Sequence, residues 1–421
     1  MRVMLCVEEA LQEVLSHCKR NERMHVPLKD AYGYILASDI HASVSVPPFD
    51  RAALDGYAVR AADIEQATPD SPVRLQVIER IGAGQVSTKS VGPGQAIRTM
   101  TGAPFPDGAD TLVRLEMTSA IGEPEQTHVD VKVAVPCGEA VAREGEDIKS
   151  GMCMLRSGIT IGGAEMALLA TAGIASVPVY RKPVIGILAS GRELTDIREP
   201  LAYGKIYDSN SYMLAGAVQA WGGIPRLLGR AGDDVDELVQ TIQSALPHVD
   251  GLVTTGGVSV GDFDVMIDAY RKAGGEVHFW KVSIRPGTPF TFATIEDKPV
   301  FGLSGNPAAG FVNAMLFVQP AIRAISGMNE PIVRPVRAFL SGMPEVRAVA
   351  LDRFLRADVF IKDGTVFAQP RTQGQKAAIL SSLTGTQGFV RIPSKTQPQA
   401  GDLVDVYLLH MPVSFADGDR V

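Results

Sequence analysis

The sequence predicts a multidomain protein that joins a doubly wound α/β domain to mainly β domains. Its 421 residues correspond to roughly three domains at about 150 residues each. Between Val184 and Gly327, short β-rich runs alternate with longer helical patterns, which is typical of a parallel sheet with crossover helices. Before and after this stretch, β-rich runs separated by glycine and proline turns indicate domains built mainly from strands.

Composition and charge argue against several classes of function. The chain has 40 Lys and Arg against 47 Asp and Glu, a net charge of −7, so we do not expect it to bind nucleic acid non-specifically. Its apolar runs, such as Val184–Ala189, are far shorter than the ~20 residues that cross a bilayer, so no membrane span is expected. Residues 7–18 predict an amphipathic helix rather than a secretory signal. The four cysteines lack a Cys-x-x-Cys pair, which predicts reduced, buried thiols in a cytoplasmic protein.

The segment before the α/β domain contains two kinds of pattern. Residues 44–147 predict a mainly β domain, with strands near Arg74–Ile78 and Val129–Val135 and little helical periodicity. Residues 148–180 return to a helical pattern at Ala164–Ala172. If this helix packs with the N-terminal helix, the β segment is an insertion in a helical domain.

The remaining elements follow from periodicity and turn residues. In the α/β domain we expect strands at Val184–Ala189, Ile224–Leu228, Gly251–Thr255 and Val300–Leu303, and helices near Ser209–Ala220, after Asp233-Asp234 and after Gly261. A small C-terminal β domain is expected to have strands at Val336–Leu340, Phe354–Ile361, Thr365–Gln369 and Leu403–Leu409. Within it, Lys362-Asp363-Gly364 is a hairpin turn signal.

Two loops follow strands of the predicted α/β sheet at the edge where doubly wound folds bind ligands. The glycine-rich loop Gly256–Gly261 and the loop Ser304–Pro307 could each present backbone N–H groups to an anion, and Asn306 is placed to cap the following helix. The glycine-rich loop is not a Walker loop, because it lacks the Gly-Lys-Ser/Thr ending of that motif. Each loop alone could be only a tight turn or a capped helix, but together they predict a phosphate or oxyanion pocket.

Charged residues extend this candidate site. Lys281 and Arg285 stand four residues apart beside a Pro-Gly-x-Pro turn, so they could clamp an oxyanion or a pyrophosphate, or could simply be solvated. Scattered carboxylates could hold Mg²⁺, or could be caps and solvated charges; they are Asp55, Asp147, Glu193, Asp262 and Asp264. We identify no His-x-x-x-His motif and no Glu-paired spacing among the seven histidines, so a zinc or iron site is not expected.

A set of motifs spreads over most of residues 1–325. It comprises Pro47-Pro48-Phe49-Asp50, Asp55-Gly56-Tyr57-Ala58, Thr101-Gly102-Ala103-Pro104, Gly145-Glu146-Asp147-Ile148, Ile206-Tyr207-Asp208-Ser209-Asn210, Gly256–Gly261 with Asp262, Lys281 with Pro286-Gly287, and Gly305-Asn306-Pro307. In content and order this set resembles the molybdopterin molybdenumtransferases of the MoeA type, which are related to the E domain of gephyrin. Each motif alone would be weak, whereas the set is specific.

The resemblance implies four domains and an elongated homodimer. They are a split helical domain (1–43 and 148–180), an inserted mainly β domain (44–147), an α/β molybdopterin-binding domain (181–327) and a C-terminal β-barrel-like domain (328–421). It also implies an active site between the α/β domain of one subunit and the inserted domain of the other. A molybdopterin adenylyltransferase and molybdoenzyme maturation proteins are the partners that such an enzyme could have.

The resemblance further implies a reaction and the roles of residues. The family uses molybdate and Mg²⁺ to convert adenylylated molybdopterin to molybdenum cofactor with release of AMP. Lys281 and Arg285 would attract molybdate or screen the pyrophosphate, and Thr101 and Ser259 would donate hydrogen bonds. The catalytic acids would be Asp55, Asp147, Glu193 and Asp264, with Asp55, Glu193 and Asp264 as candidate Mg²⁺ ligands. The pterin phosphate end would contact Gly256, Gly257, Ser259, Gly261, Asp262, Ser304, Gly305, Asn306 and Pro307.

Some positions depart from the family's usual pattern and leave alternatives open. Arg51 begins a segment that lacks two usual polar side chains, Arg192 replaces a common Asp, Thr288 stands where Lys is frequent, and Ala309 lacks a hydroxyl. A catalytically weakened paralogue that binds the pterin nucleotide or acts as a scaffold is one alternative. Adenylylation of molybdopterin itself is another, although the additional β domains argue against it. The acids at the matching positions favour the molybdenum-inserting enzyme.

Overall fold

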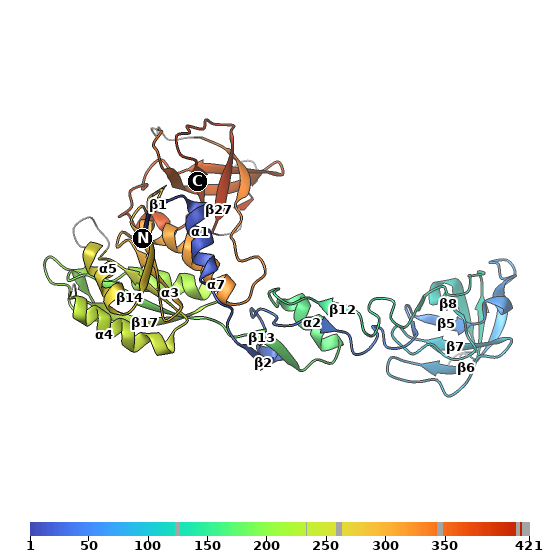
Figure 1. Cartoon of the computed structure of the whole chain (residues 1–421). Helices are drawn as coiled ribbons and strands as arrows, with labels where there is room; N and C mark the ends of the chain where they lie inside the picture. Colours follow the sequence, from blue (N-terminus) through green and yellow to red (C-terminus); the bar gives the residue numbers. More distant parts are fainter. Residues whose placement is uncertain (123–126, 233, 258–262, 343–347, 410–412, 415–421) are drawn as a thin grey trace.

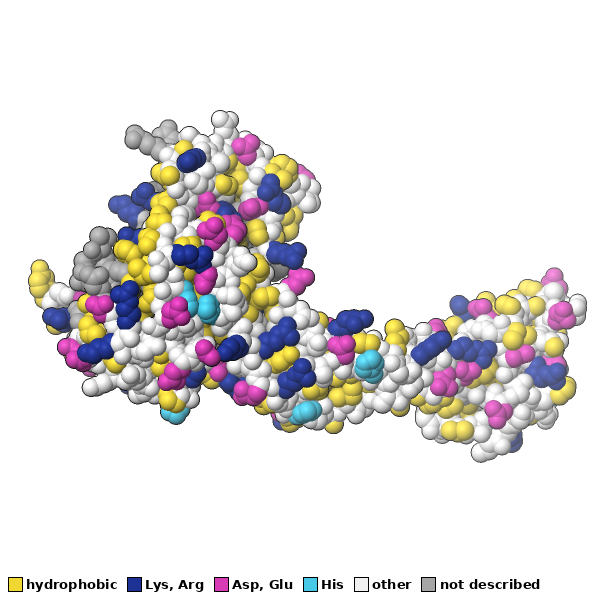
Figure 2. Space-filling view, in the orientation of Figure 1, with side chains coloured by type: hydrophobic (Ala, Val, Ile, Leu, Met, Phe, Trp, Pro, Cys, Tyr) yellow, Lys and Arg dark blue, Asp and Glu magenta, His cyan; other side chains and the backbone are white. Residues whose placement is uncertain are grey.

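The computed structural model describes residues 1–122, 127–232, 234–257, 263–342, 348–409 and 413–414. The chain is elongated, with the α/β part and the C-terminal barrel at one end and a β lobe at the other (Figure 1). A narrow middle region of short strands and one helix joins these two ends (Figure 1). Basic and acidic side chains are interspersed over the face shown in Figure 2.

The α/β part is built on a mixed seven-stranded sheet in the order β1-β19-β21-β22-β18-β14-β17. The strands are β1 (Arg2–Leu5), β14 (Val184–Ser190), β17 (Ile224–Ala231), β18 (Gly251–Thr255), β19 (Glu276–Val282), β21 (Phe290–Ile295) and β22 (Lys298–Leu303). Strand β14 lies between β17 and β18 and runs parallel to both. Because the chain leaves β14 toward β17 and returns on the other side at β18, the topological switch point lies between β14 and β18. The predicted doubly wound fold is confirmed.

Helices cover both faces of this sheet. One face carries α1 (Val7–Ser16), α3 (Asn210–Ala220) and the continuous helix formed by α6 (Pro307–Asn313), η5 (Ala314–Val318) and α7 (Gln319–Ile325). The other carries α4 (Val235–Ala245), followed by η4 (Leu246–His248), and α5 (Phe263–Lys272). The helix from Pro307 to Ile325 is long and apolar enough to span a membrane, but 83% of that stretch is buried inside the protein. We therefore interpret it as the central core helix of this part.

The N-terminal segment packs differently from the prediction. Strand β1 pairs in parallel with β19, and α1 lies against η5, α7 and β19. Val7, Ala10 and Val14 on one face of α1 are buried in the core of the α/β part. The prediction that this helix packs with residues 148–180 is wrong, because its apolar face finds a larger apolar surface on the α/β sheet.

The middle region is formed by two passes of the chain. Its elements are β2 (Arg23–Pro27), η1 (Leu28–Asp30), β3 (Ile40–His41), β12 (Cys153–Leu155), α2 (Gly163–Thr171) and β13 (Ser176–Tyr180). Strand β2 pairs with β13, and β3 pairs with β12, so segments on both sides of the β lobe meet here. The helix predicted at Ala164–Ala172 is α2.

The β lobe contains a six-stranded sheet in the order β8-β5-β7-β6-β10-β9. Its elements are β4 (Arg51–Ala52), β5 (Gly56–Val59), η2 (Ala61–Ile64), β6 (Val73–Ile81), β7 (Gln95–Thr99), β8 (Thr111–Arg114), η3 (Leu115–Met117), β9 (Thr118–Ile121), β10 (His128–Val131) and β11 (Val141–Ala142). The strand predicted at Val129–Val135 is shorter than expected, because pairing of β10 with β6 and β9 ends at Val131. Strand β4 pairs with β11 at the base of the lobe.

The C-terminal part is a small barrel, as the resemblance implied. Its elements are β20 (Ile284–Arg285), β23 (Val336–Leu340), β24 (Asp352–Lys362), β25 (Thr365–Pro370), η6 (Ser381–Leu383), β26 (Gly388–Ile392), β27 (Leu403–Leu408) and β28 (Val413–Ser414). The order β24-β25-β23-β27-β26 closes on itself because β26 also pairs with β24. Asp363 and Gly364 have φ of 49° and 73°, which fits the predicted hairpin turn.

The barrel packs directly on the α/β part. Phe389 of β26 is fully buried, and its ring centroid lies 6.2 Å from that of Phe311 in α6. Arg391 of the same strand forms an ion pair with Glu8 of α1 at 2.6 Å.

All four cysteines are free thiols, but Cys6 and Cys137 are exposed, so the prediction of buried thiols is wrong for these two.

Candidate functional site

A cavity of about 330 Å³ opens at the carboxyl edge of the α/β sheet, at the switch point. Loops after β14, β18 and β22 surround it, as the sequence predicts for a ligand site. Two short strands, β15 (Leu194–Thr195) and β16 (Ile206–Tyr207), form one wall. The lining residues are Ser190, Glu193, Leu194, Ile206, Tyr207, Asp208, Ser209, Asn210, Thr255, Gly256, Gly305, Asn306, Pro307, Ala378 and Leu380.

Gly256 lets the loops after β14 and β18 approach each other closely. It has φ of 94°, and a Cβ atom there would lie 2.0 Å from the carbonyl oxygen of Ser190. Its N–H donates to the carbonyl of Leu303 at 3.2 Å, which ties the glycine loop to the end of β22. Any side chain at this position would therefore displace the backbone that lines the cavity.

The rest of the predicted glycine loop is only partly described. Gly257, with φ of 65°, faces Ser190, because a Cβ atom there would lie 3.3 Å from Ser190 Oγ. Ser259, Gly261 and Asp262 lie outside the described residues. Asp264 lies in the described backbone of α5, but its side chain is outside what the structure describes.

The predicted loop Ser304–Pro307 lies on the opposite side of the cavity. Asn306 precedes α6 and Pro307 begins it, as predicted, but the Asn306 side chain makes no capping hydrogen bond. Instead, the Asn306 N–H donates to Ser304 Oγ at 3.2 Å. The N-terminal turn of the core helix thus points toward the cavity, where its N–H groups favour an anion. Ala309 is buried, so its missing hydroxyl leaves the cavity wall unchanged.

Asn210 is a residue whose role the sequence did not reveal. Its Nδ2 donates to Thr255 Oγ1 at 2.9 Å and to the carbonyl of Gly305 at 2.8 Å. One amide therefore links the loops after β18 and β22 to the start of α3. Nearby, Asp208 accepts the N–H of Ser211 at 3.0 Å. The motif that contains Asp208 and Asn210 was the available signal, but the motif alone does not say which side chain turns inward.

Among the residues that the structure describes, three polar atoms around the cavity are buried and have no hydrogen-bond partner. They are Ser190 Oγ, Asn210 Oδ1 and Ser211 Oγ. A buried polar group without a partner costs about 1–3 kcal/mol, so such groups are expected to bind a ligand or water. Two of the three residues, Ser190 and Asn210, line the cavity, which indicates a site for a polar ligand.

The C-terminal barrel completes the cavity wall through Ala378 and Leu380. This segment is fixed to α6 because the Ala308 N–H donates to the carbonyl of Ala377 at 3.0 Å. Inside the barrel loop, the buried Arg356 donates to the carbonyls of Gly374 and Lys376. Burial, with a smaller contribution from Arg371, lowers the pKa of Arg356 to about 10, so the guanidinium remains charged at neutral pH.

The two predicted cations, Lys281 and Arg285, lie at the same edge of the sheet as the cavity, but neither is among its described lining residues. Lys281, near the end of β19, places its Nζ 3.8 Å from the centroid of the Trp280 ring, a cation–π contact. Arg285 lies in β20 and is paired in register with Arg353 of the barrel. Arg285 is exposed, and neither cation belongs to the described cavity lining.

The other predicted residues lie in the β lobe or in the link that leads to it. Asp55 Oδ1 accepts the backbone N–H of Thr101 at 2.7 Å and its hydroxyl at 2.8 Å. These hydrogen bonds, the backbone one first, lower the pKa of Asp55, so its carboxylate is ionised at neutral pH. The exposed Asp147 follows β11, and its N–H donates to the carbonyl of Val46 at 3.0 Å. The structure confirms that Asp55 and Thr101 form a pair.

Within one chain the two sets of acids do not meet. Glu193 lines the cavity in the α/β part, whereas Asp55 directly precedes β5 of the β lobe at the far end of the molecule (Figure 1). Asp147 lies beside Val46 in the link between this lobe and the middle region. The middle region, with α2 and the β2–β13 pair, separates the lobe from the α/β part (Figure 1). Asp55 and Asp147 therefore do not lie at the cavity that Glu193 lines in the same chain.

Three family models match the chain. The MoeA N-terminal region (domain I and II) matches residues 5–173, a probable molybdopterin binding domain matches 186–324, and the MoeA C-terminal region (domain IV) matches 348–409. A molybdopterin molybdenumtransferase of Bacillus subtilis is 41% identical over 97% of this chain and 95% of its own length. The chain belongs to the MoeA family of molybdopterin molybdenumtransferases.

Other members of the MoeA family agree with this assignment. A molybdopterin molybdenumtransferase of Staphylococcus aureus is 35% identical over 96% of this chain and 95% of its own length. A crystal structure of a MoeA protein from Pyrococcus horikoshii superposes with a TM-score of 0.81 at 32% identity and covers 96% of this chain and all of its own. The MoeA family consists of transferase enzymes, and all residues of the cavity wall except Ala378 and Leu380 lie in the segment that matches the probable molybdopterin binding domain.

Proposed function

We propose that this protein inserts molybdenum from molybdate into adenylylated molybdopterin, with Mg²⁺, and releases AMP. The observation that carries the proposal is the cavity at the switch point, with buried and unpartnered Ser190 Oγ and Asn210 Oδ1 in its wall. Its ~330 Å³ is at the lower end of the range for small-molecule sites, about 300–1,000 Å³, so it fits part of a dinucleotide-sized substrate. Membership of the MoeA family supplies the chemical class.

Binding of the phosphate end of the pterin follows from the groups in the cavity wall. The N-terminal turn of α6 would offer N–H groups to a phosphate, and the Ser190 hydroxyl would donate a further hydrogen bond. Asn210 Oδ1 would accept from an N–H of the substrate, while its Nδ2 keeps the two loops together. Gly256 allows the backbone to come close to the ligand because no side chain stands in the way.

The charged residues would act on the pyrophosphate linkage. Lys281 and Arg285, at the same edge of the sheet, would attract molybdate or screen the charge that develops when the linkage breaks. Asp55, oriented by Thr101 and held ionised, would orient the attacking oxygen or bind the metal ion. Asp147, Asp262 and Asp264 stay predictions, as does the hydrogen bond expected from Ser259.

The oxygen donors at the cavity fit Mg²⁺. Glu193 has an exposed carboxylate in the cavity wall, and Mg²⁺ typically takes one or two carboxylates together with substrate phosphates and waters. Glu193 would hold the ion, with Asp55 of a second subunit and Asp264 as further candidates. When bound, Mg²⁺ would neutralise charge on the pyrophosphate during cleavage.

We also propose that the active protein is a homodimer. The separation of Asp55 from Glu193 within one chain supports this, because a second copy could place its β lobe over the cavity of the first (Figure 1). Transfer of substrate from a molybdopterin adenylyltransferase, delivery to molybdoenzyme maturation proteins and a cytoplasmic location remain predictions from the resemblance.

The test is AMP release from adenylylated molybdopterin by the purified full-length protein under anaerobic conditions. We expect release that requires both molybdate and Mg²⁺, with molybdenum retained on the pterin. Tight substrate binding without AMP release would contradict the proposal and favour the scaffold alternative, with Arg51 and Arg192 as the first positions to restore. Consumption of ATP without molybdate would indicate adenylylation instead.

A further inference from the structure

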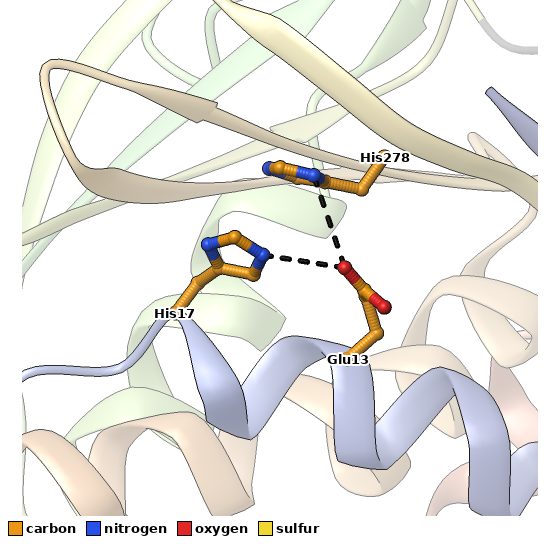
Figure 3. A group of neighbouring side chains, drawn as sticks. All are labelled: Glu13, His17 and His278. Atoms are coloured by element: carbon orange, nitrogen blue, oxygen red, sulfur yellow. Dashed lines mark hydrogen bonds and ion pairs between the residues drawn. The ribbon is translucent and has the colours of Figure 1, made fainter.

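Two histidines and a glutamate meet on the face of the sheet that carries α1. Glu13 lies in α1, His17 directly follows this helix, and His278 lies in β19 (Figure 3). His17 Nε2 is 3.3 Å and His278 Nδ1 is 3.9 Å from the same oxygen, Glu13 Oε1. Within the described part of the chain, the ligating atoms of these three side chains lie within 4.8 Å of one another.

Local structure explains why the three side chains converge. Residues four apart on a helix lie on one face, so Glu13 and His17 point together toward β19 (Figure 3). The parallel pairing of β1 with β19 holds α1 over that strand. The two imidazole rings are 4.0 Å apart between centroids and tilted by 31°. The cluster is therefore fixed by the packing of the N-terminal segment on the sheet.

Each side chain also has a partner that orients it. His278 Nε2 pairs with Thr294 Oγ1 of β21 at 2.9 Å, which leaves Nδ1 facing Glu13. Arg2 of β1 donates to the other carboxylate oxygen, Oε2, which leaves Oε1 facing both histidines. Outer partners of this kind are typical of metal ligands, because they fix the tautomer and the direction of the lone pair.

We propose that Glu13, His17 and His278 form a binding site for a divalent transition-metal ion of the zinc class, with water completing the coordination. Two imidazole nitrogens and one carboxylate oxygen, with an open fourth position, are a ligand set that Zn²⁺ uses. Metal–ligand bonds of about 2.0–2.1 Å place tetrahedral ligand atoms about 3.4 Å apart. The observed 3.3 and 3.9 Å separations need only a small movement of the partly exposed Glu13 and His17 side chains toward the more buried His278.

The surroundings allow the ion to enter and the ligands to bind it. A groove of about 310 Å³ reaches Glu13 from solvent and is lined by Arg2, Glu9, Gln12, Glu13 and Ser16. The side chains of His17 and Glu13 are partly exposed, so an ion can reach the ligating atoms without unfolding of the segment. The expectation that no histidine has Glu-paired spacing is therefore wrong, because Glu13 and His17 stand four residues apart and interact. The third side chain, His278, lies far along the chain, so no local motif contains all three.

Metal binding would connect the N-terminal segment to the catalytic part. The ion would join α1 to β19, and β19 ends next to Lys281, only three residues beyond His278. Because binding requires the folded arrangement of α1 and β19, occupancy would stabilise the native state. This inference does not depend on the proposed molybdenum reaction.

The test uses the full-length chain without an affinity tag, stripped of metals and titrated with ZnCl₂ in competition with a chromophoric chelator. We expect one Zn²⁺ per chain and a rise in Tm on binding. Affinity should fall more than about tenfold in His17→Ala, His278→Ala and Glu13→Gln, since each loses a ligand. The matched control is His248→Ala, at an exposed histidine outside the cluster, which should bind Zn²⁺ as tightly as the wild type.

A second measurement distinguishes the proposed site from metal binding at cysteine thiols, and a second variant distinguishes loss of a ligand from loss of folding. CoCl₂ should give the visible spectrum of a four- or five-coordinate nitrogen and oxygen site, without a sulfur-to-cobalt charge-transfer band. Glu13→Gln keeps the shape of the side chain, so it tests the site even if His278→Ala fails to fold. Unchanged Zn²⁺ affinity in Glu13→Gln and His17→Ala, a charge-transfer band from cysteine, or no bound Zn²⁺ would each overturn the proposal.

Discussion

At Asp55, two hydrogen bonds from one residue decide the charge state. Both come from Thr101 to the same carboxylate oxygen, and they lower the pKa of Asp55. We expect Asp55→Asn to reduce AMP release by about 10²-fold, the size of effect typical for loss of one electrostatic group at a reacting centre. Because Asp55 is already ionised at neutral pH, the loss should be the same between pH 6 and pH 8.

The control for this substitution is Asp63→Asn in the same β lobe. Asp63 also accepts a backbone N–H, from Gly94 at 2.9 Å, but it is not part of the candidate site. It should retain wild-type turnover. Equal turnover in Asp55→Asn and the wild type, with the same substrate preparation, would remove Asp55 from the mechanism.

Asn210 should matter for substrate binding rather than for stability. Its amide joins the loops after β18 and β22 through Thr255 and Gly305. Asn210→Ala is expected to raise KM for the pterin substrate about tenfold, which corresponds to about 1.4 kcal/mol, with little change in Tm. Gln219→Ala, an exposed amide on the same helix, is the control and should leave KM unchanged. A parallel fall in Tm would instead assign Asn210 a structural role.

Residue types could be predicted from the sequence where local pattern decides, but not where distant segments meet. Gly256 and Pro307 follow from strand–loop–helix junctions and lie where they were expected. Asn210 was visible only as part of a motif, because its contacts with Thr255 and Gly305 join three separate loops. The Glu13–His17 pair is local in the sequence, but it forms a candidate metal site only together with His278, which lies far along the chain.

At the scale of elements, the α/β strands were the most predictable. Strand β18 has the predicted bounds, Gly251–Thr255, and is buried along its whole length. Strand β1 was not predicted from the sequence, because only Leu5 of its residues is buried and its partner strand β19 lies far along the chain. The placement of α1 depends on that pairing, so its assignment to the helical domain failed for the same reason.

An ionic cluster fastens the middle region to the α/β part. Arg181, in the link between β13 and β14, makes two 2.7 Å hydrogen bonds to Asp250, which precedes β18. Asp250 also accepts from the N–H of Val184 at 2.7 Å and from Asn21 at 3.3 Å. Burial raises the pKa of Asp250, but these hydrogen bonds outweigh it and lower the pKa overall. Both chain segments that enter the middle region are therefore held at one carboxylate.

This cluster predicts a pH-dependent loss of stability. Asp250→Ala should lower the free energy of unfolding by about 2 kcal/mol at pH 7, the value of hydrogen bonds to a charged group. Because the folded-state pKa is lowered, the stabilisation is complete above the unfolded pKa of about 3.9 and is lost as pH falls through the native value. Urea unfolding at pH 7 and at pH 3 measures this difference.

The control for the pH measurement is Asp268→Ala, which removes an exposed ion pair with Arg271. Exposed ion pairs contribute about 0–1 kcal/mol to the free energy of unfolding, so the stability of this variant should differ little from that of the wild type at either pH. A loss of stability in Asp250→Ala that is as large at pH 3 as at pH 7 would show that packing, rather than charge, is responsible.

The arrangement of the whole molecule depends on contacts that no local pattern encodes. The closure of the barrel through β24 and β26, and its packing on α6, join residues from separate parts of the chain. The separation of the β lobe from the α/β cavity is likewise a property of the middle region (Figure 1). Only the family resemblance could predict these features.

A shared active site makes a prediction about mixed dimers. If Asp55 of one subunit serves the cavity of the other, a heterodimer of Asp55→Asn and Glu193→Ala chains has one intact and one doubly altered site. Purified through two different tags, it should recover about half of wild-type AMP release, although each parent homodimer has lost most of its activity. A heterodimer of a wild-type chain and the Asp55→Asn/Glu193→Ala double variant should be inactive, because each of its sites contains one altered residue. If the site lay within one chain, the results would be reversed, with activity in the second heterodimer and none in the first.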